Sequence, residues 1–274
     1  MGNILSARSF VNWYNGHPYH SSLLSEVIDL SKIEHVTVVG QGNVAMDVGR
    51  ILLKSIDELR ETDLPEYALA ELARSTVKRV DIVGRRGPLQ LAATTKELRE
   101  MMSLEGVGFE CDTVLLDEAK DILERQPGMN GARMRGRAID LLRKGSKEKF
   151  GSTAKSWSFQ FLKSPTSFLP RPLSPPASSE HHLSSNEDTI GSILYAINTL
   201  SPPKGGTEGD AFDPSRLRAV RSGVERVEKT DMVMKSVGYR SIGLAGLPFD
   251  ERNSTIRNVD GRVTQADGTT VSLS

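Results

Sequence analysis

The sequence predicts an α/β protein built on a parallel β-sheet, and the prediction rests on three observations. Two short β-branched runs, residues 36–39 and 80–83, have the apolar character of buried strands. Each run ends at a glycine and is followed by residues with helical spacing. The apolar faces of those following segments are long enough to cover a sheet. Strands that alternate with helices are typical of a parallel sheet with helices packed on it.

The first of these units has the clearest pattern. The strand over 36–39 is followed by a glycine-rich break and then by helical spacing from Val44. The apolar residues on one face of this helix are Val44, Val48, Ile51, Leu52 and Ile56. A second helix is expected from Pro65 to Arg74, because proline is favoured in the first turn. These two helices are expected to precede the next strand.

The second unit begins with the strand over 80–83, which Gly84 closes, and continues into a helix expected over roughly 92–103. The stretch 119–150 is basic and is expected to be helical in part. Further strands are expected within 157–168, over 190–200 and over 232–234. The segments 170–190 and 201–214 are rich in proline, serine or glycine and are expected to be inserted loops.

The composition excludes several classes of function. The 35 Lys and Arg residues balance the 35 Asp and Glu residues, so a general nucleic-acid or membrane-surface binder is not expected. One cysteine among 274 residues excludes an internal disulfide framework and a cysteine-rich metal site. The pair His181-His182 has no metal-ligand spacing around it, so no metal site is expected. No apolar run approaches the ~18 residues of a membrane-spanning helix.

The most informative motif joins the first strand to the first helix. Residues 40–45, Gly-Gln-Gly-Asn-Val-Ala, fit the G-x-G-x-x-A pattern of dinucleotide-binding folds. Gly40 would allow the tight turn, Gly42 would let a pyrophosphate approach the backbone, and Ala45 would allow close packing of helix on strand. Free N–H groups at the helix start would then bind the phosphates. The alternative is a strand, turn and helix that pack together without a ligand.

The residues after the second strand indicate which dinucleotide would bind. An NAD site usually has an acidic residue there for the ribose hydroxyls, whereas this chain has Arg85 and Arg86. Guanidinium groups bind a 2′-phosphate through charge-assisted hydrogen bonds, which favours NADP. The interval from Gly40 is longer than usual, so the region 55–75 is interpreted as an insertion. The alternative for this arginine pair is a solvated turn.

Short segments spread in order over residues 4–263 resemble the adrenodoxin reductase family. The segments that carry the resemblance are 6–16, 39–48, 83–90, 96–101, 236–239 and 248–250. This resemblance implies a mitochondrial enzyme that takes a hydride from NADPH onto FAD and passes single electrons to a small acidic iron–sulfur protein, an adrenodoxin or ferredoxin. The resemblance does not imply a nucleic-acid partner.

The resemblance also assigns roles to particular residues. It implies that Gln41, Gly42, Asn43 and Val44 contact the NADP pyrophosphate, with Gly40 in the same turn, and that Arg85 and Arg86 bind the 2′-phosphate. It places Glu97 near the nicotinamide, although the spacing of Glu97 alone indicates only an exposed helix face with charge pairs. Arg99 and the arginines of 133–137 would belong to a basic face that docks the iron–sulfur partner.

The expected architecture is therefore a Rossmann-like NADP-binding domain with remnants of a flavin-binding domain. Residues 1–10 would be a remnant of the connection to the FAD domain, residues 11–235 the NADP-binding domain, and residues 236–274 a partial return to the FAD domain. The family has a second glycine fingerprint for FAD, and this sequence contains one such motif. Little reductase activity is therefore expected of the chain alone. The alternative is an NADP-binding fragment or regulatory subunit that works with a flavin-carrying partner.

Overall fold

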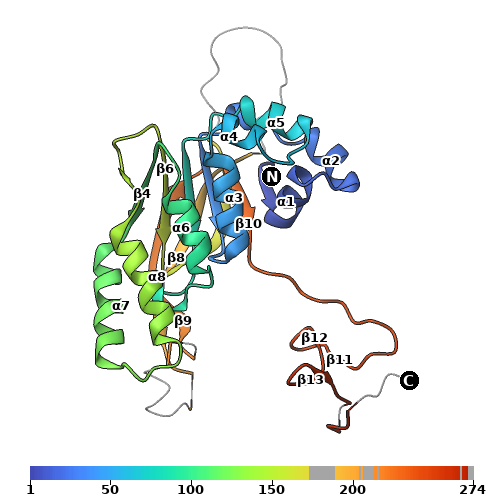
Figure 1. Ribbon diagram of the computed structural model, residues 1–274, viewed down its shortest axis with the longest axis vertical. Helices are drawn as coiled ribbons and strands as arrows, with labels where there is room; N and C mark the ends of the chain where they lie inside the picture. Colours follow the sequence, from blue (N-terminus) through green and yellow to red (C-terminus); the bar gives the residue numbers. More distant parts are fainter. Residues whose placement is uncertain (173–188, 204, 206–212, 215, 266, 271–274) are drawn as a thin grey trace. The chain divides into compact units, whose positions relative to one another are not determined.

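The computed structural model describes residues 1–172, 189–203, 205, 213–214, 216–265 and 267–270 (Figure 1). The chain separates into two compact units, residues 1–237 and 238–274. Of the two expected loop insertions, most of 170–190 and of 201–214 lies outside the described residues, as does the pair His181-His182. The first unit contains the sheet and the helices that the sequence predicts.

A seven-stranded sheet forms the centre of the first unit, with the strand order β1-β10-β2-β3-β6-β4-β5, and every neighbouring pair in it is parallel. The strand bounds are β1 Ile4–Ser6, β2 His35–Val39, β3 Arg79–Val83, β4 Val107–Cys111, β5 Glu148–Lys149, β6 Lys155–Gln160 and β10 Met232–Lys235. The register pairs Val39 with Val83 and Val83 with Gln160, so β2, β3 and β6 end side by side. This shared end positions the site described below.

Helices cover one face of this sheet. The helix bounds are α1 Ala7–Tyr14, α2 Pro18–Ser25, α3 Asn43–Leu53, α4 Ile56–Arg60, α5 Glu66–Ala73, α6 Thr95–Met102, α7 Thr113–Arg125 and α8 Ala132–Lys144, and short 3-10 turns cover Leu30–Lys32 and Pro88–Gln90. Helices α3 and α6 lie side by side against the central strands (Figure 1). At Gly49 of α3, an added Cβ would lie 3.7 Å from Val80 and 3.8 Å from Ile82, which shows how closely α3 packs on β3.

A second sheet packs against part of the opposite face. It is antiparallel, in the order β7-β8-β9, with bounds β7 Lys163–Pro170, β8 Ile190–Ser201 and β9 Arg218–Lys229. A small apolar cluster joins the two sheets and consists of Val39, Val83, Ile190, Ile193, Tyr195 and Val233. The first unit therefore has three layers, helices, parallel sheet and antiparallel sheet, and the expected α/β class is confirmed.

Two features differ from the sequence-based expectations. The first helix ends at Leu53 and does not reach Ile56, because Lys54 is extended and Ser55 caps the separate helix α4 by accepting a hydrogen bond from the Glu58 N–H. In the first unit, strands β1, β4, β5 and β9 and helices α1 and α2 were not expected. The remaining predicted strands and the predicted helices over 65–74 and 92–103 are present, with ends shifted by one to three residues.

A buried carboxylate ties three parallel strands together on the second face. Asp81 is 4% exposed, and its carboxylate lies 2.7 Å from His35 Nε2, accepts from Arg79 Nε at 2.9 Å and accepts from Ser158 Oγ at 2.7 Å. Burial alone would raise the pKa of Asp81, but His35, Arg79 and Ser158 outweigh it and hold the pKa below its ordinary value. The ionised form of Asp81 therefore stabilises the fold.

The substitution Asp81→Asn is expected to lower the free energy of unfolding by about 2 kcal/mol at neutral pH, because it leaves buried partners with poorer bonds. Since the folded-state pKa is depressed, the stabilisation is present above the ordinary value of 3.8 and is lost as pH falls through the folded-state value. Urea unfolding over a series of pH values should show the largest difference between variant and parent at pH 7, and the difference should shrink as pH falls below 3.8. A difference of equal size at every pH value would contradict this role.

The second unit, residues 238–274, contains two small antiparallel hairpins. One pairs β11 Phe249–Asp250 with β12 Thr255–Ile256, and the other pairs β13 Asn258–Val259 with β14 Arg262–Val263. The assignment of residues 1–10 and 236–274 to a flavin-binding domain stays a prediction. Across the described residues of both units, every helix is too short or too polar to span a bilayer.

Candidate dinucleotide-binding site

The turn after β2 depends on a backbone conformation that favours glycine. Gly40 has a φ of +131°, and a Cβ built on it would lie 2.0 Å from the carbonyl oxygen of Ser236. The Gly40 N–H donates to Val83 O at 2.8 Å, and the Ser236 N–H donates to Val39 O at 2.7 Å. The glycine turn is thereby fixed between the ends of β3 and β10.

The first turn of α3 has no side-chain cap and faces open space at Gly42. Gly42 is its N-cap and supplies no side-chain hydrogen bond, and no acidic residue lies in the first turn. A Cβ at Gly42 would have no atom within 4 Å, so the backbone there faces open space. Helices α4, α6 and α7 are capped by Ser55, Thr94 and Asp112, whereas α1, α2, α5 and α8 lack a side-chain cap as α3 does. Uncapped N–H groups at the positive end of a helix dipole form a phosphate-binding arrangement.

The turn between β2 and α3, residues 40–42, is called the glycine turn, and the turn after β3, residues 84–87, is called the arginine turn. The two turns touch through Gln41. The Gln41 side chain lies across Gly84, where a Cβ would come within 1.8 Å of Gln41 Cδ. The Gln41 side chain therefore leaves no room for a side chain at position 84, where the chain has glycine. The Gln41 amide nitrogen, Nε2, is buried and has no hydrogen-bond partner among the described residues. The structure brings these two predicted loops into direct contact.

The backbone of the arginine turn is held in place while its side chains stay unpaired. Asn198 of β8 donates to Arg85 O at 3.0 Å, and the Leu162 N–H donates to Arg86 O at 3.2 Å. Arg85 is exposed and Arg86 is half-buried. Burial lowers the pKa of Arg86, and the charges of Arg85 and Arg135 lower it further. Within the described residues neither Arg85 nor Arg86 forms an ion pair, so the turn carries positive charge available to an anion.

Asn43 connects the glycine turn to helix α6. Its side-chain oxygen accepts from the Thr94 N–H at 2.8 Å, and Thr94 caps α6 by accepting from the Glu97 N–H at 3.3 Å. Glu97 therefore lies in the first turn of α6, beside the start of α3. Its side chain is 17% exposed and pairs with Arg50 at 3.5 Å. Glu97 thus lies at a helix start that Thr94 caps, and its carboxylate is one of those that pair with Arg50.

Arg50 is the centre of a small ion-pair cluster between α3 and α6. Besides Glu97, it contacts Asp47 at 2.6 Å and also pairs with Glu100. Burial raises the pKa of Asp47, Arg50 opposes that rise, and Glu97 adds to it. The cluster explains the position of Glu97 without a ligand, so a contact between Glu97 and a coenzyme is not required by this geometry.

Unsatisfied buried polar atoms gather around the two loops. Within the described part of the chain, the buried side-chain nitrogen and oxygen atoms without a partner are Gln41 Nε2, Gln90 Oε1, Arg135 Nε and Trp157 Nε1. Gln41 belongs to the glycine turn, Gln90 to the 3-10 turn that follows Gly87, and Arg135 to α8, from which it bonds to Leu89 O. A buried polar atom without a partner costs roughly 1–3 kcal/mol. Their concentration here is the pattern expected where a polar ligand completes the hydrogen bonding.

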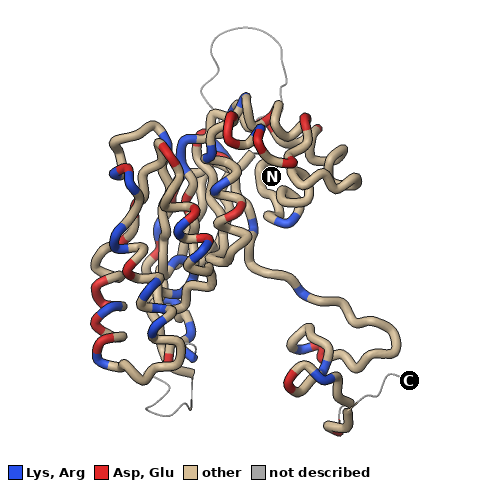
Figure 2. Tube along the Cα trace, in the orientation of Figure 1, with Lys and Arg blue, Asp and Glu red and all other residues tan. Residues whose placement is uncertain are grey.

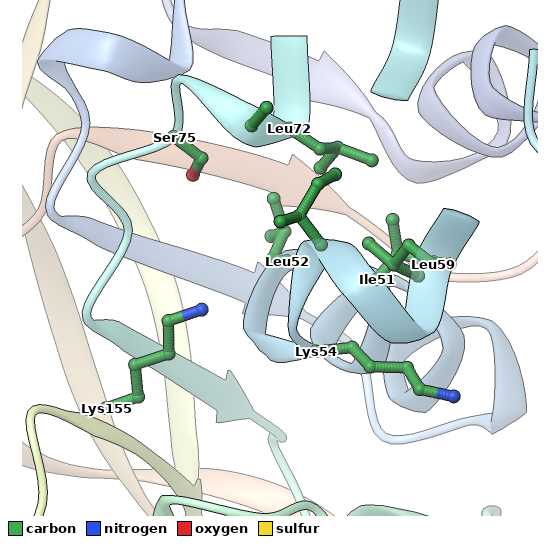
Figure 3. A pocket seen from close by; sticks show the side chains of 9 residues that line it. Ile51, Leu52, Lys54, Leu59, Leu72, Ser75 and Lys155 are labelled. Atoms are coloured by element: carbon green, nitrogen blue, oxygen red, sulfur yellow. The ribbon is translucent and has the colours of Figure 1, made fainter. Parts of the chain in front are cut away.

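A separate pocket lies at the opposite end of the parallel strands, where they begin. Figure 3 shows Lys155 and Ser75 on one side of it and Leu52, Leu59 and Leu72 on the other, and its volume is about 140 Å³. Lys155 is the first residue of β6, whereas the glycine turn follows the last residue of β2. The Lys155 ammonium donates to Leu53 O at 3.0 Å and so caps the end of α3. This pocket is distinct from the candidate site.

Sequence reasoning missed residues that hold the site from a distance. Asn198, Gln90 and Arg135 reach the arginine turn from β8, from the 3-10 turn after it and from α8. Only tertiary packing brings them there. Thr94 could have been found, because Thr94 and Glu97 have the spacing of a capping box.

Comparison with known proteins shows the relationship over nearly the whole chain. The chain is 39% identical to the mitochondrial NADPH:adrenodoxin oxidoreductase of Salvelinus fontinalis over 98% of its length, which corresponds to 49% of that protein. It is 37% identical to the mitochondrial protein of the same name from Bos taurus, over 97% of this chain and 49% of that one. No family model matches the sequence.

A solved structure agrees with these relatives. The structure of FprA from Mycobacterium tuberculosis in complex with NADPH has 32% sequence identity and a TM-score of 0.75, covering 97% of this chain and 51% of that one. The chain spans about half the length of the curated relatives it matches. The order of the family segments, the α/β fold and these identities agree, and the chain belongs to the family of the NADPH:adrenodoxin oxidoreductases and FprA-type ferredoxin reductases.

Proposed function

We propose that this chain is the NADPH-binding part of an NADPH:adrenodoxin or ferredoxin oxidoreductase. The observation that carries the proposal is the contact between an uncapped helix start and an arginine pair without ion-pair partners among the described residues. Gly40, Gln41, Gly42, Asn43 and Val44 would hold the pyrophosphate. Arg85 and Arg86 would bind the 2′-phosphate that distinguishes NADPH from NADH.

Glu97 is proposed to lie at the nicotinamide end of the coenzyme, as the family resemblance implies. The link from Asn43 through Thr94 supports this placement, because it sets the start of α6 beside the pyrophosphate-binding turn. One carboxylate oxygen of Glu97 accepts a hydrogen bond from Arg50 Nη1 at 3.5 Å. Its role toward a coenzyme would be to position the ring, and no proton transfer is assigned to it.

The complete reductase is proposed to use FAD, which supplies an acceptor for hydride and releases electrons one at a time. The residues assigned above would hold one dinucleotide, and the unpartnered atoms of Gln41, Gln90 and Arg135 support this assignment. No residue is assigned to FAD. The proposed electron acceptor is a small acidic iron–sulfur protein, and mitochondria are the proposed compartment because relatives are named as mitochondrial.

Of the residues expected on the basic docking face, Arg99 and the arginines of 133–137, we propose Arg99, Arg133 and Arg137 as part of the surface for that acidic partner, because Arg135 is turned to Leu89 O. Figure 2 shows basic positions along α8 and acidic positions along the neighbouring α7. The two helices are joined by the pairs Lys120–Asp140 and Arg143–Asp117. Arg99, Arg133 and Arg137 are exposed and have no ion-pair partner within the described residues. Exposed, unpaired arginines favour steering of an acidic protein.

A second candidate is an NADP-binding fragment or regulatory subunit without reductase activity of its own. The single glycine fingerprint at residues 40–45 is the observation that favours it. Calorimetry of the purified chain should show NADPH binding under either candidate. Reduction of a ferredoxin by the chain with NADPH and added FAD would support the complete activity, whereas NADPH binding without ferredoxin reduction is the expected result. A folded chain that shows no heat of binding with NADPH would overturn both candidates.

A further inference from the structure

A third guanidinium lies against the arginine turn and comes from a distant part of the chain. Arg135 is in the first turn of α8, and its Nη1 donates to Leu89 O at 2.7 Å. Leu89 belongs to the 3-10 turn Pro88–Gln90, which directly follows Arg85, Arg86 and Gly87. The bond therefore anchors the Arg135 side chain at the turn proposed to receive the 2′-phosphate.

The side chain of Arg135 has a donor that the described residues do not use. Its Nε is buried and has no hydrogen-bond partner among the described residues. A guanidinium has five N–H donors, and the bond to Leu89 O engages one end of it. If Arg135 only braced the 3-10 turn, a neutral donor would serve as well and would avoid the cost of burying a charged group.

The charges at this turn also lack counter-charges. Burial is the largest cause that lowers the pKa of Arg86. The nearby positive charges of Arg85 and Arg135 lower this pKa further. No carboxylate in the described part of the chain pairs with these three arginines, whereas Arg50, Arg79 and Arg143 of the same unit each have acidic partners. Like charges held together without a counter-ion favour an anion of more than one negative charge.

We propose that Arg135 is a specificity-determining residue that adds a third positive charge around the 2′-phosphate of the coenzyme. It is held by its bond to Leu89 O, so its charge is fixed close to that of Arg86. A phosphate monoester carries close to two negative charges at neutral pH and would relieve the mutual repulsion of the three guanidiniums. The inference rests on the proposed NADPH-binding function and adds to it a residue from α8.

The test compares two probes that differ only in the 2′-phosphate, adenosine 2′,5′-bisphosphate and adenosine 5′-monophosphate. Calorimetry on the full chain would use Arg135→Gln, Arg135→Lys and a control, Lys144→Gln, which removes one positive charge from an exposed position at the other end of α8. Arg135→Gln should weaken the bisphosphate about tenfold, the size of one lost charge-assisted contact. It should leave the monophosphate unchanged and reduce the salt dependence of bisphosphate binding.

The conservative variant and the control separate charge from structure. Arg135→Lys keeps the positive charge and should lose less bisphosphate affinity than Arg135→Gln, and Lys144→Gln should not change it. Equal weakening of both probes by Arg135→Gln, together with a lower midpoint of thermal unfolding, would show a structural role and overturn the inference. Unchanged bisphosphate affinity in Arg135→Gln would overturn it as well, while the proposed function would stand if Arg85→Ala with Arg86→Ala removed that affinity. A parent chain that binds both probes equally would refute the proposed function itself.

Discussion

The double variant Arg85→Ala with Arg86→Ala is expected to bind NADPH at least about 100-fold more weakly than the parent chain. Its affinity for NADH should change by no more than about threefold, because the 2′-phosphate is absent from NADH. The two guanidiniums are the groups at the end of β3 that the protein itself leaves without ion-pair partners among the described residues. The expected result is therefore a loss of coenzyme preference and not a general loss of binding.

The size of this effect follows from the number of charged contacts removed. A hydrogen bond to a charged group contributes about 1.5–3 kcal/mol, and two such contacts give about 3–6 kcal/mol. Each ~1.4 kcal/mol corresponds to a tenfold change in affinity. Because Arg86 is half-buried, its contact with a phosphate should be screened less by salt than that of exposed Arg85. Arg86→Ala alone should then have the larger effect.

The fold should survive this double substitution. The turn is held by bonds to its backbone, from Asn198 to Arg85 O and from Leu162 to Arg86 O, and these do not involve the side chains. The double variant Arg125→Ala with Lys144→Ala is a matched control, since it removes two positive charges from exposed helix ends. Calorimetric titration of each protein with NADPH and with NADH measures the effect. Equal weakening of both coenzymes would show that the arginines do not recognise the 2′-phosphate.

The central strands and their connections could be predicted because their signals are local. Residues 36–39 and 80–83 are β-branched, fully apolar on one face and closed by glycines, so β2 and β3 were identified. Strand β9 was missed because nearly all of its residues are exposed and it is held by backbone bonds to β8. Strand β4 was missed because Gly108 and Glu110 interrupt its apolar run. The break after Leu53 had a local signal, the capping-box spacing of Ser55 and Glu58.

The candidate site divides in the same way. The glycine turn and the arginine turn are each a short run of residues with special chemistry, so their positions follow from the sequence. Their contact does not, because the packing of Gln41 on Gly84 depends on the register of β2 with β3. Asn198 lies 113 positions along the chain from Arg85, and Arg135 lies 46 positions from Leu89. No local pattern encodes such separations.

The substitution Gly40→Ala is expected to lower the free energy of unfolding by about 3–6 kcal/mol, a large share of the stability of an ordinary domain. The added Cβ would lie 2.0 Å from Ser236 O, which is a backbone atom and cannot rotate away. The φ of +131° at Gly40 also strains any residue with a Cβ. Relief would require separating the turn from the end of β10, where the Ser236 N–H bonds to Val39 O at 2.7 Å.

The matched variant Gly42→Ala should behave in the opposite way, and the pair distinguishes folding from binding. At Gly42 an added Cβ meets no atom within 4 Å, and the N-cap φ of −97° suits an L-residue. Gly42→Ala should therefore unfold at the same urea concentration as the parent, yet bind NADPH about tenfold or more weakly, because the methyl group occupies the path of the pyrophosphate. Full NADPH affinity in a stable Gly42→Ala protein would show that the coenzyme does not cross this turn. The open space at Gly42 would then be an ordinary surface of the helix start and not the floor of a binding site.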